Sequence, residues 1–225
     1  MKRCALFLAI LGCAPATAPA PRRTTEPIER VEAATKVIHE AEMAADAAIP
    51  LSIAHAARCV AVVPGLLNAG LVLGARAGGG IVSCRSKDGW SDPRFFMVSS
   101  ATAGAQAGVA RVDLVMLAMT EASESAFLAR KLELGGGIAF AAGPIGRSVQ
   151  ATSDVTLKPV LTYSRVQGVF AGIDIGALNV DADEDAARAF YGDERDLGVL
   201  LRGSQAVPES AMRFRAELAR VFGPS

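Results

Sequence analysis

The chain has 225 residues, of which 51% are hydrophobic and 5% aromatic, a size that suits one domain with a short appendage. Its 23 basic and 23 acidic side chains balance, which argues against a protein that binds nucleic acid through bulk electrostatics. With so few aromatic residues, we expect a core of Ala, Val, Leu and Ile packed around glycine.

The first residues, MKRCALFLAILGC, have the outline of a bacterial lipoprotein signal, with a basic start and an apolar stretch before Cys13. The letters ILGC resemble a lipobox, in which the cysteine is acylated and becomes the new N-terminus. This predicts a signal peptide over 1–12 and a Pro/Ala-rich tether over 13–26. Ala14 is not the Asp that commonly retains lipoproteins at the inner membrane, so we expect an outer-membrane anchor facing the periplasm. An ordinary signal cut near the following Ala-Pro run is the alternative.

Two cysteines, Cys59 and Cys84, remain after such a cleavage. An oxidising periplasm permits a disulfide between them, whereas cysteines in apolar strand-like segments are as often buried free thiols. The sequence leaves both alternatives open.

Residues 27–225 predict a single domain with helices at both ends. Apolar residues recur at helical spacing from Pro27 to Ala48, and several later segments alternate with period two. The pair Pro64-Gly65 predicts a turn. We expect helices over 27–48, 51–58, 121–131, 183–191 and 208–222, and strands near 59–63, 69–76, 79–86, 94–102, 106–119, 135–142, 148–155, 159–166 and 168–175.

This order of a helix, many strands and then helices indicates an α+β fold with a mainly antiparallel sheet. Strands so rich in Gly and Ala curl easily. We therefore expect a strongly curved Gly-rich sheet or partial barrel, with an N-terminal helix and C-terminal helices.

The stretch VLGARAGGGIV, residues 72–82, has the look of a phosphate-binding loop but not its spacing. A dinucleotide fingerprint that starts at Gly78 would need its third glycine where Ser83 stands, and no Lys-Ser or Lys-Thr follows any of these glycines. We therefore expect no nucleotide ligand, and we interpret the glycines as bulges, turns and close backbone contacts.

Residues that could support catalysis or metal binding are sparse. His39 and His55 are the two histidines, and neither has a metal-ligand partner nearby in the sequence. The segment DADEDAARAFYG, residues 181–192, begins like a calcium loop, but Ala186 and Gly192 stand where that loop needs Gly and Glu. Its acids fit the N-terminus of a helix better. We expect no metal, no cofactor and no enzymatic activity.

Several segments in a fixed order carry a family resemblance. They are PGLLNAGLVLGARAGGG (64–80), WSDP (90–93), AAGPIGR (141–147), YSRVQGVFAG (163–172) and FYG (190–192). Together they resemble the SYLF family of lipid-binding domains, from about residue 30 to the end of the chain. In eukaryotes these domains occur beside SH3 or FYVE modules in actin-patch and endocytic proteins, and in bacteria as secreted or lipid-anchored single domains. The resemblance implies phospholipid binding without enzymatic activity.

Two arginines adjoin Gly-rich strand connections within these segments, Arg147 and Arg165. A guanidinium binds phosphate oxygens bidentately, and Trp favours the level of the lipid headgroups. We therefore expect Arg147 and Arg165 to contact an anionic phospholipid headgroup, with Lys158 as a weaker helper and Trp90 at the rim. Loss of the signal peptide leaves a mature charge of about −2, so the attraction has to be local.

Other interpretations remain open for the same residues. Both arginines can instead pair with acids such as Asp154 or Asp174 and hold the sheet together. The chain as a whole can be an adaptor that binds another envelope protein through this surface, or a hydrolase with an unrecognised site.

Overall fold

The computed structural model describes residues 27–43, 49–70, 73–103, 108–129, 131–134, 140–145, 158–166, 169–172, 178–192 and 207–224. Cys13, Arg147 and the strand expected near 148–155 lie outside these ranges. The helices are α1 (Pro27–Met43), α2 (Leu51–Ala56), α3 (Glu121–Leu128), α5 (Glu184–Tyr191) and α7 (Glu209–Phe222). The strands are β1 (Cys59–Gly70), β2 (Leu73–Ser86), β3 (Gly89–Trp90), β4 (Arg94–Ala103), β5 (Gly108–Ala118), β6 (Lys131–Leu134), β7 (Phe140–Ala142), β8 (Val160–Val166), β9 (Val169–Gly172) and β10 (Leu178–Ala182).

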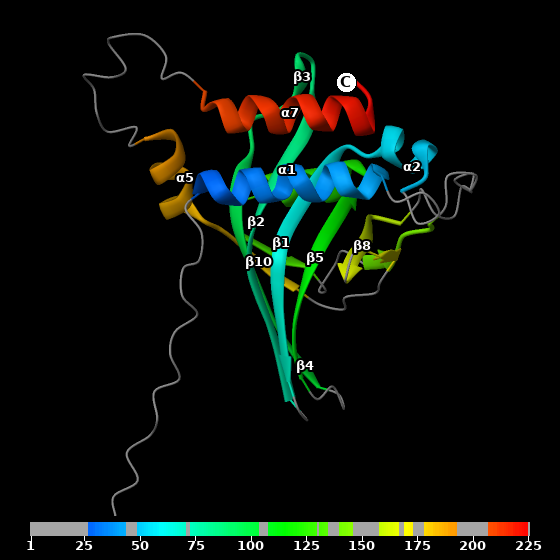
Figure 1. Cartoon of the computed structure of the whole chain (residues 1–225), viewed down its shortest axis with the longest axis vertical. Coiled ribbons are helices and arrows are strands. Elements are labelled where there is room, and N and C mark those ends of the chain that lie inside the picture. Colours follow the sequence, from blue (N-terminus) through cyan, green and yellow to red (C-terminus); the bar gives the residue numbers. More distant parts are fainter. Residues whose placement is uncertain are drawn as a thin grey trace, which may run out of the picture.

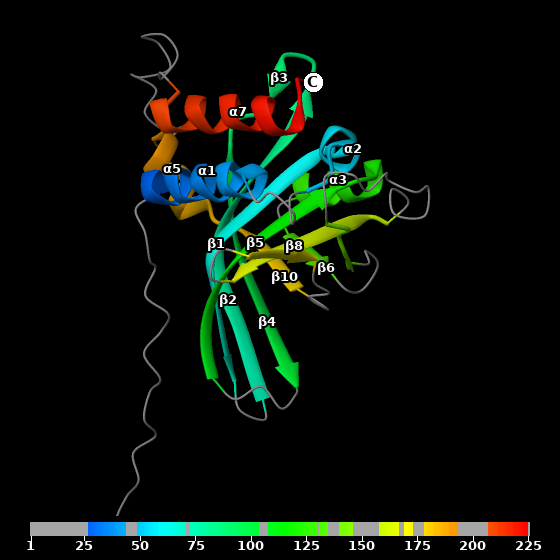
Figure 2. The ribbon, with the colours of Figure 1, turned by 45° about the vertical axis from the view of Figure 1, so that its right-hand side comes forward.

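The strands form one strongly curled sheet, a half-barrel whose curvature is visible in Figure 2. Its order is β6-β10-β4-β2-β1-β5-β8-β7, with β3 paired to β2 and β9 paired to β8. Every described pair is antiparallel except β7 with β8. The expected α+β class, with a curved and mainly antiparallel sheet, is confirmed.

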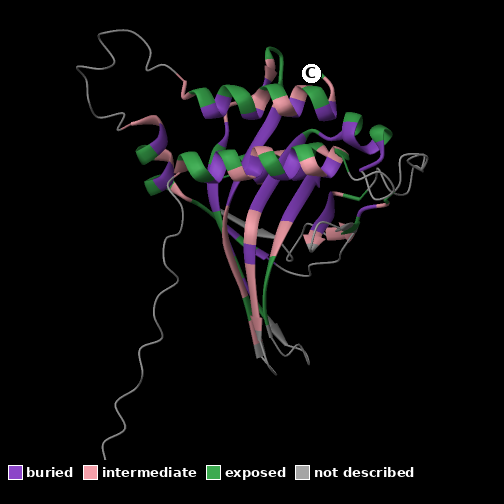
Figure 3. Cartoon of the chain, viewed as in Figure 1, coloured by how far each residue is buried: buried purple, intermediate pink, exposed green. Residues whose placement is uncertain are grey.

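Two apolar layers lie on opposite faces of this sheet, because alternate residues of a strand point to opposite sides. One layer joins strand residues such as Val60 and Val62 to the buried sides of α1 and α7, which cross the sheet side by side (Figure 1). The other joins Cys59, Ala61 and further strand residues to Phe127 of α3. Figure 3 shows that the buried residues of the strands concentrate in the part of the sheet that lies beneath the helices.

The predicted turn at Pro64-Gly65 is wrong, because β1 runs without a break from Cys59 to Gly70. Pro64 has no N–H to donate, and Gly65 takes a positive φ of 61°, so the register shifts here as in a bulge. The backbone N–H of Gly65 donates to Asp113 Oδ1 on β5 at 2.9 Å, which satisfies it inside the sheet. The predicted strand 69–76 therefore spans the end of β1 and the start of β2.

Three short strands, β3, β6 and β10, had no counterpart among the predicted ones. They are two, four and five residues long, too short for a clear period-two pattern. The predicted helix 121–131 ends at Leu128, and Lys131 already belongs to β6.

The glycine triplet of β2 lets other groups approach the sheet closely. A Cβ at Gly79 would lie 2.7 Å from the guanidinium carbon of Arg30 in α1. A Cβ at Gly80 would lie 2.4 Å from the ring of Phe96 and 2.8 Å from the carbonyl oxygen of Val62. The expected close backbone packing of these glycines is confirmed.

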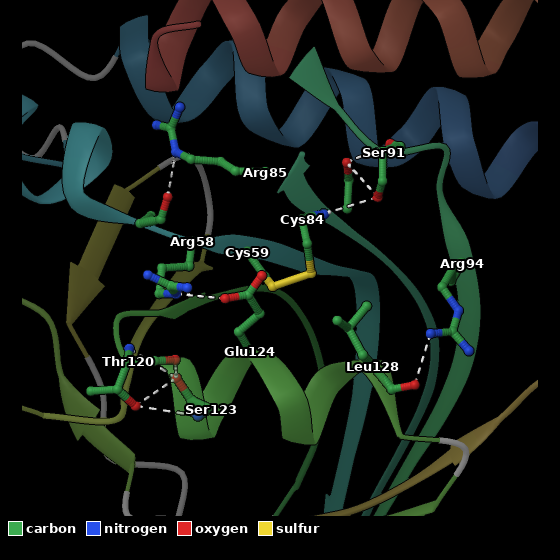
Figure 4. The surroundings of a disulfide bond; sticks show 12 residues. Arg58, Cys59, Cys84, Arg85, Ser91, Arg94, Thr120, Ser123, Glu124 and Leu128 are labelled. Atoms are coloured by element: carbon green, nitrogen blue, oxygen red, sulfur yellow. Dashed lines mark hydrogen bonds and ion pairs between the residues drawn. A yellow bond between two sulfur atoms is a disulfide. The ribbon is translucent and has the colours of Figure 1, made fainter. Parts of the chain in front are cut away.

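Cys59 of β1 and Cys84 of β2 form a disulfide (Figure 4). Cys59 and Cys84 are register partners, and both are buried. Close by, Arg58 donates to Glu124 of α3 at 2.5 Å, while Arg94 donates to the carbonyl of Leu128 at 2.8 Å. These contacts hold α3 against the end of the sheet that carries the disulfide.

Replacing Gly80 by Val tests this packing. The new side chain would collide with the ring of Phe96 and the backbone of β1, so we expect the free energy of unfolding to fall by about 3 kcal/mol. Ala75→Val is the matched control, because it introduces the same side chain at an exposed position of the same strand. Chemical denaturation of both variants checks the prediction, and equal stabilities would contradict it.

Candidate functional site

Arg165 lies in β8, opposite its register partner Asp113 in β5. Its Nε and Nη2 donate to Asp113 Oδ2 at 3.0 and 2.7 Å, and its Nη1 pairs with Glu40 of α1. The side chain is 20% exposed and so lies mostly inside this triad, whose net charge is −1. The geometry favours the role of holding helix and sheet together, through Asp113 and Glu40. Asp154 and Asp174 lie outside the described residues. Contact of Arg165 with a lipid headgroup stays a prediction.

Trp90 does not lie at a rim, contrary to the expectation. Its side chain is 2% exposed, and the indole Nε1 donates to the carbonyl of Gly223 at 3.1 Å. The ring packs edge-on against Phe222, with centroids 6.0 Å apart, and stacks under Arg85. A large apolar ring with one polar atom is well suited to such a site, because it covers the end of α7 and still finds an acceptor.

Of the other predicted site residues, the structure describes Lys158. Lys158 is exposed just before β8, while Arg147 and Cys13 lie outside the described residues. Trp90 packs against Phe222 of α7, whereas Arg165 pairs with Glu40 of α1, so the two side chains contact different helices.

The segments AAGP and YSR form one packing unit. A Cβ at Gly143 would lie 2.0 Å from the ring of Tyr163, so only glycine fits there. The N–H of Gly143 donates to the carbonyl of Thr162 at 3.0 Å, and the hydroxyl of Thr162 donates to the carbonyl of Ala141 at 3.1 Å. Burial raises the pKa of Tyr163, whose hydroxyl finds no hydrogen-bond partner among the described residues.

The acids before the FYG segment do cap a helix, as the sequence predicted. Asp183 is the N-cap of α5, and its Oδ1 accepts from the N–H of Ala186 at 3.1 Å. Its Oδ2 accepts from the buried Arg30 at 2.9 Å, and Arg30 also lies over the ring of Phe95, 5.5 Å from its centroid. This links α1, β4 and α5 through one guanidinium.

The FYG and WSDP segments also touch. The hydroxyl of Tyr191 donates to the carbonyl of Pro93 at 2.7 Å. Burial, together with the negative charge of Asp92, raises the pKa of Tyr191. The described residues of the FYG and WSDP segments therefore stabilise the fold and do not line an open cleft.

Arg85 is a structural residue that the sequence analysis missed. Its guanidinium stacks over Trp90 at 4.6 Å and donates to backbone carbonyls at distances of 2.6 to 3.5 Å. These carbonyls lie at the C-terminal ends of α2 and α7, where a positive charge is favourable. They belong to Ala54, His55, Ala57, Phe222, Gly223 and Pro224. Burial lowers the pKa of Arg85 from its very high usual value. An arginine in an apolar strand gives no sequence signal for such a role.

An open groove of about 490 Å³ lies between α1 and α7. Both signs of charge line it, so it offers no strong field for an ion of either sign. Its lining residues are Glu32, Thr35, Lys36, His39, Ser210, Arg213 and Glu217.

Glu217 bridges the two helices that form this groove. It accepts from Arg220 at 2.6 Å and lies 3.1 Å from Nδ1 of His39. The hydrogen bonds from Arg220, and secondarily from His39, hold the pKa of Glu217 below its usual range.

The described ranges contain neither a candidate metal site nor a candidate membrane-spanning helix. No group of three or more His, Cys, Asp and Glu side chains in them could hold a metal ion. None of the helices described above is both long and apolar enough to cross a membrane.

Comparison with known proteins identifies one family. The family model "Ysc84: Las17-binding protein actin regulator" matches residues 99–221. The chain is 33% identical to Protein YSC84 of Saccharomyces cerevisiae over 172 residues, which cover 74% of this chain and 36% of the relative. It is 32% identical to LAS seventeen-binding protein 3 of the same yeast, over 79% of this chain and 40% of the relative.

An animal protein is similar as well. The SH3 domain-containing YSC84-like protein 1 of Xenopus laevis is 32% identical over 66% of this chain and 45% of the relative. The chain thus spans less than half the length of these curated relatives. No solved structure matches it.

The bridge through Glu217 generates a pH-dependent prediction. Because the folded-state pKa lies below the unfolded value of about 4.3, this carboxylate stabilises the fold above that pH, and the contribution is lost as the pH falls through the folded pKa. We expect Glu217→Gln to cost about 1 kcal/mol at pH 7 and nothing once the carboxylate of the wild type is protonated. Urea denaturation at a series of pH values measures this, with Glu32→Gln, an exposed position in the same groove, as control. A loss that stays constant at every pH would contradict it.

Proposed function

Because the chain belongs to the Ysc84 family, whose domain is the SYLF domain, we propose that it is a non-enzymatic phospholipid-binding protein of the bacterial cell envelope. The observation that carries the proposal is the family match over residues 99–221, more than half of the chain. Phospholipid binding is what the resemblance to SYLF domains implies. The family description names an actin regulator that binds a protein, not an enzyme, which supports the non-enzymatic part.

The envelope location rests on two independent features of this chain. The ILGC sequence at Cys13 fits an acylated N-terminus, in an outer membrane and facing the periplasm. The disulfide between Cys59 and Cys84 fits an oxidising compartment such as the periplasm.

Protein binding is the second candidate function. The name of the yeast relative LAS seventeen-binding protein 3 describes a protein that binds another protein. By analogy, this chain would serve as an adaptor that holds an envelope protein.

Vesicle co-sedimentation tests the phospholipid proposal. The mature chain, residues 13–225 with Cys13→Ser so that no acyl chain contributes, should pellet with vesicles that contain phosphatidylglycerol. It should pellet less with pure phosphatidylcholine, and less at high salt, because the attraction is electrostatic. No binding to either vesicle, together with a stable complex with an envelope protein, would favour the adaptor instead.

The expected headgroup arginines are tested in the same assay. Arg147→Ala with Arg165→Ala should cut binding to the anionic vesicles at a temperature where the variant, which has lost the ion pairs of Arg165 with Asp113 and Glu40, is still folded. Arg188→Ala with Arg213→Ala removes the same charge from exposed helix surfaces and is the matched control. Binding lost only together with unfolding would assign Arg165 to its ion pairs with Asp113 and Glu40 alone.

Acylation is tested on the native protein in cells. Cys13→Ser should release the protein from the membrane fraction or leave its precursor uncleaved, because the thiol that carries the lipid is gone. Intact-mass analysis of the wild type should show the added acyl chains on Cys13. An unmodified N-terminus downstream of Cys13 would contradict the anchor.

A further inference from the structure

One end of the sheet projects beyond the helices. There, β4, β2, β1 and β5 lie side by side, and Figures 1 and 2 both show their far ends reaching past α1 and α7. Among the described residues, β10 pairs with β4 only as far as Ser99, and β8 pairs with β5 only from Asp113. We call this four-stranded projection the arm; its residues used below are 66–70, 74–77, 99–101 and 109–112.

The arm presents an apolar row that no described element covers. The row consists of register partners across the four strands: Ala101, Ala75, Ala69 and Val109. Ala101 and Ala75 are exposed, and Val109 is 75% exposed, the largest value among the large hydrophobic side chains that the structure describes. An exposed apolar row on a projecting part of a protein is typical of a site that contacts a partner or a membrane.

The charges near the arm follow a simple pattern. Residues 59–75 and 95–110, which include the far ends of β1, β2, β4 and β5, contain no Asp, Glu, Lys or Arg. The first charges back along the arm are Arg76 in β2 and Arg111 in β5. Arg76 pairs in register with Asn68 and Ser100, in the row next to the apolar one, so its side chain lies on the other face of the arm.

Arg111 lies on the same face as Val109, two residues nearer the helices. It is exposed, and its Nη1 reaches the carbonyl of Gly65 at 3.5 Å, the limit of hydrogen-bonding distance. Each face of the arm thus has an apolar or neutral outer part and one arginine behind it.

We propose that the arm is the lipid-contacting element of this protein: its apolar row enters the interface of an anionic membrane, and Arg76 and Arg111 bind headgroup phosphates behind it. The inference rests on the proposed function and names the surface that carries it out. Positive charge behind an uncharged tip complements an anionic membrane. The uncharged tip leaves water at a small cost in free energy, and the arginines behind it bind phosphate oxygens.

Among the described residues, no strand pairs with the outer ends of β4 and β5, and these edges set the depth of the arm. An unpaired sheet edge is not tolerated in the hydrocarbon core, because its N–H and C=O groups would lack partners there. At the level of the headgroups, water and phosphates supply those partners. The arm therefore stays at the interface and does not span the membrane.

A second copy of the chain is the competing occupant, since an open strand edge can add another strand. The charge pattern favours lipid. A second copy would present the same arginines, whereas anionic headgroups present the opposite charge.

Fluorescence quenching tests the contact directly. Trp90 is the single tryptophan and is buried, so Val109→Trp adds a second, accessible reporter at the arm. In residues 13–225 with Cys13→Ser, brominated phosphatidylglycerol vesicles should quench the added fluorescence and leave that of Trp90 nearly unchanged. If this variant pellets with the vesicles but the added fluorescence is not quenched, the lipid contact lies elsewhere; the arm proposal is then overturned while the proposed function survives.

Binding measurements give the matching loss of function. Val109→Asp should weaken binding to the same vesicles about tenfold and Arg111→Gln about fivefold, with unchanged melting temperatures. Arg76→Gln should weaken binding about fivefold as well, measured at a temperature where the variant is folded. Met212→Asp, at an exposed apolar position of α7, is the control and should bind normally. Equal binding by Val109→Asp and Met212→Asp would overturn the proposal.

Two further outcomes are distinguishable. If the wild-type chain binds no vesicle at all, the proposed function fails and the arm proposal fails with it. If sedimentation shows a dimer without lipid that Val109→Asp converts to a monomer, a second copy covers the row and the arm proposal alone is overturned.

Discussion

The absence of side chains at three successive positions of β2 is the constraint on which the rest of this structure depends. Gly79 leaves room for the guanidinium of Arg30, and Gly80 for the ring of Phe96 on the opposite face. Arg30 then reaches Asp183, the N-cap of α5, so one close approach sets the position of α1, α5 and β4 together. A glycine triplet that could be mistaken for a phosphate-binding loop thus makes room for an arginine of the protein itself.

The buried and half-buried arginines of this domain are engaged within the fold. Arg30 is paired with Asp183, Arg85 with the carbonyls at the ends of α2 and α7, and Arg165 with Asp113 and Glu40. A guanidinium that already faces a carboxylate has little attraction left for a phosphate, because the acid competes for the same N–H groups. For an anionic ligand, the exposed Arg111 of the arm is therefore better placed than Arg165.

Much of the fold followed from local patterns, and the failures have identifiable causes. The long helices at both ends were predictable because their apolar residues recur over several turns, and the α+β class followed from their order. The pair Pro64-Gly65 misled because the same residues that make a turn also make a bulge, and only Asp113, nearly fifty residues away in the sequence, decides between them. Trp90 misled for a related reason: its burial depends on Phe222 and Gly223 at the other end of the chain.

The disulfide lies at the end of the β1–β2 hairpin opposite the arm, and this position gives it a role in the register of the strands. Cys59 pairs with Cys84 at one end of the ladder, and Gly70 pairs with Gly74 at the other. Strands rich in glycine and alanine specify their register weakly, and a slip by one residue would move every side chain of a strand to the other face. A covalent link at the base, beside the buried layers, prevents that slip. It thereby keeps Ala69 and Ala75 together in the apolar row on one face of the arm, with Arg76 on the other face, as the proposed contact of this row with a membrane needs.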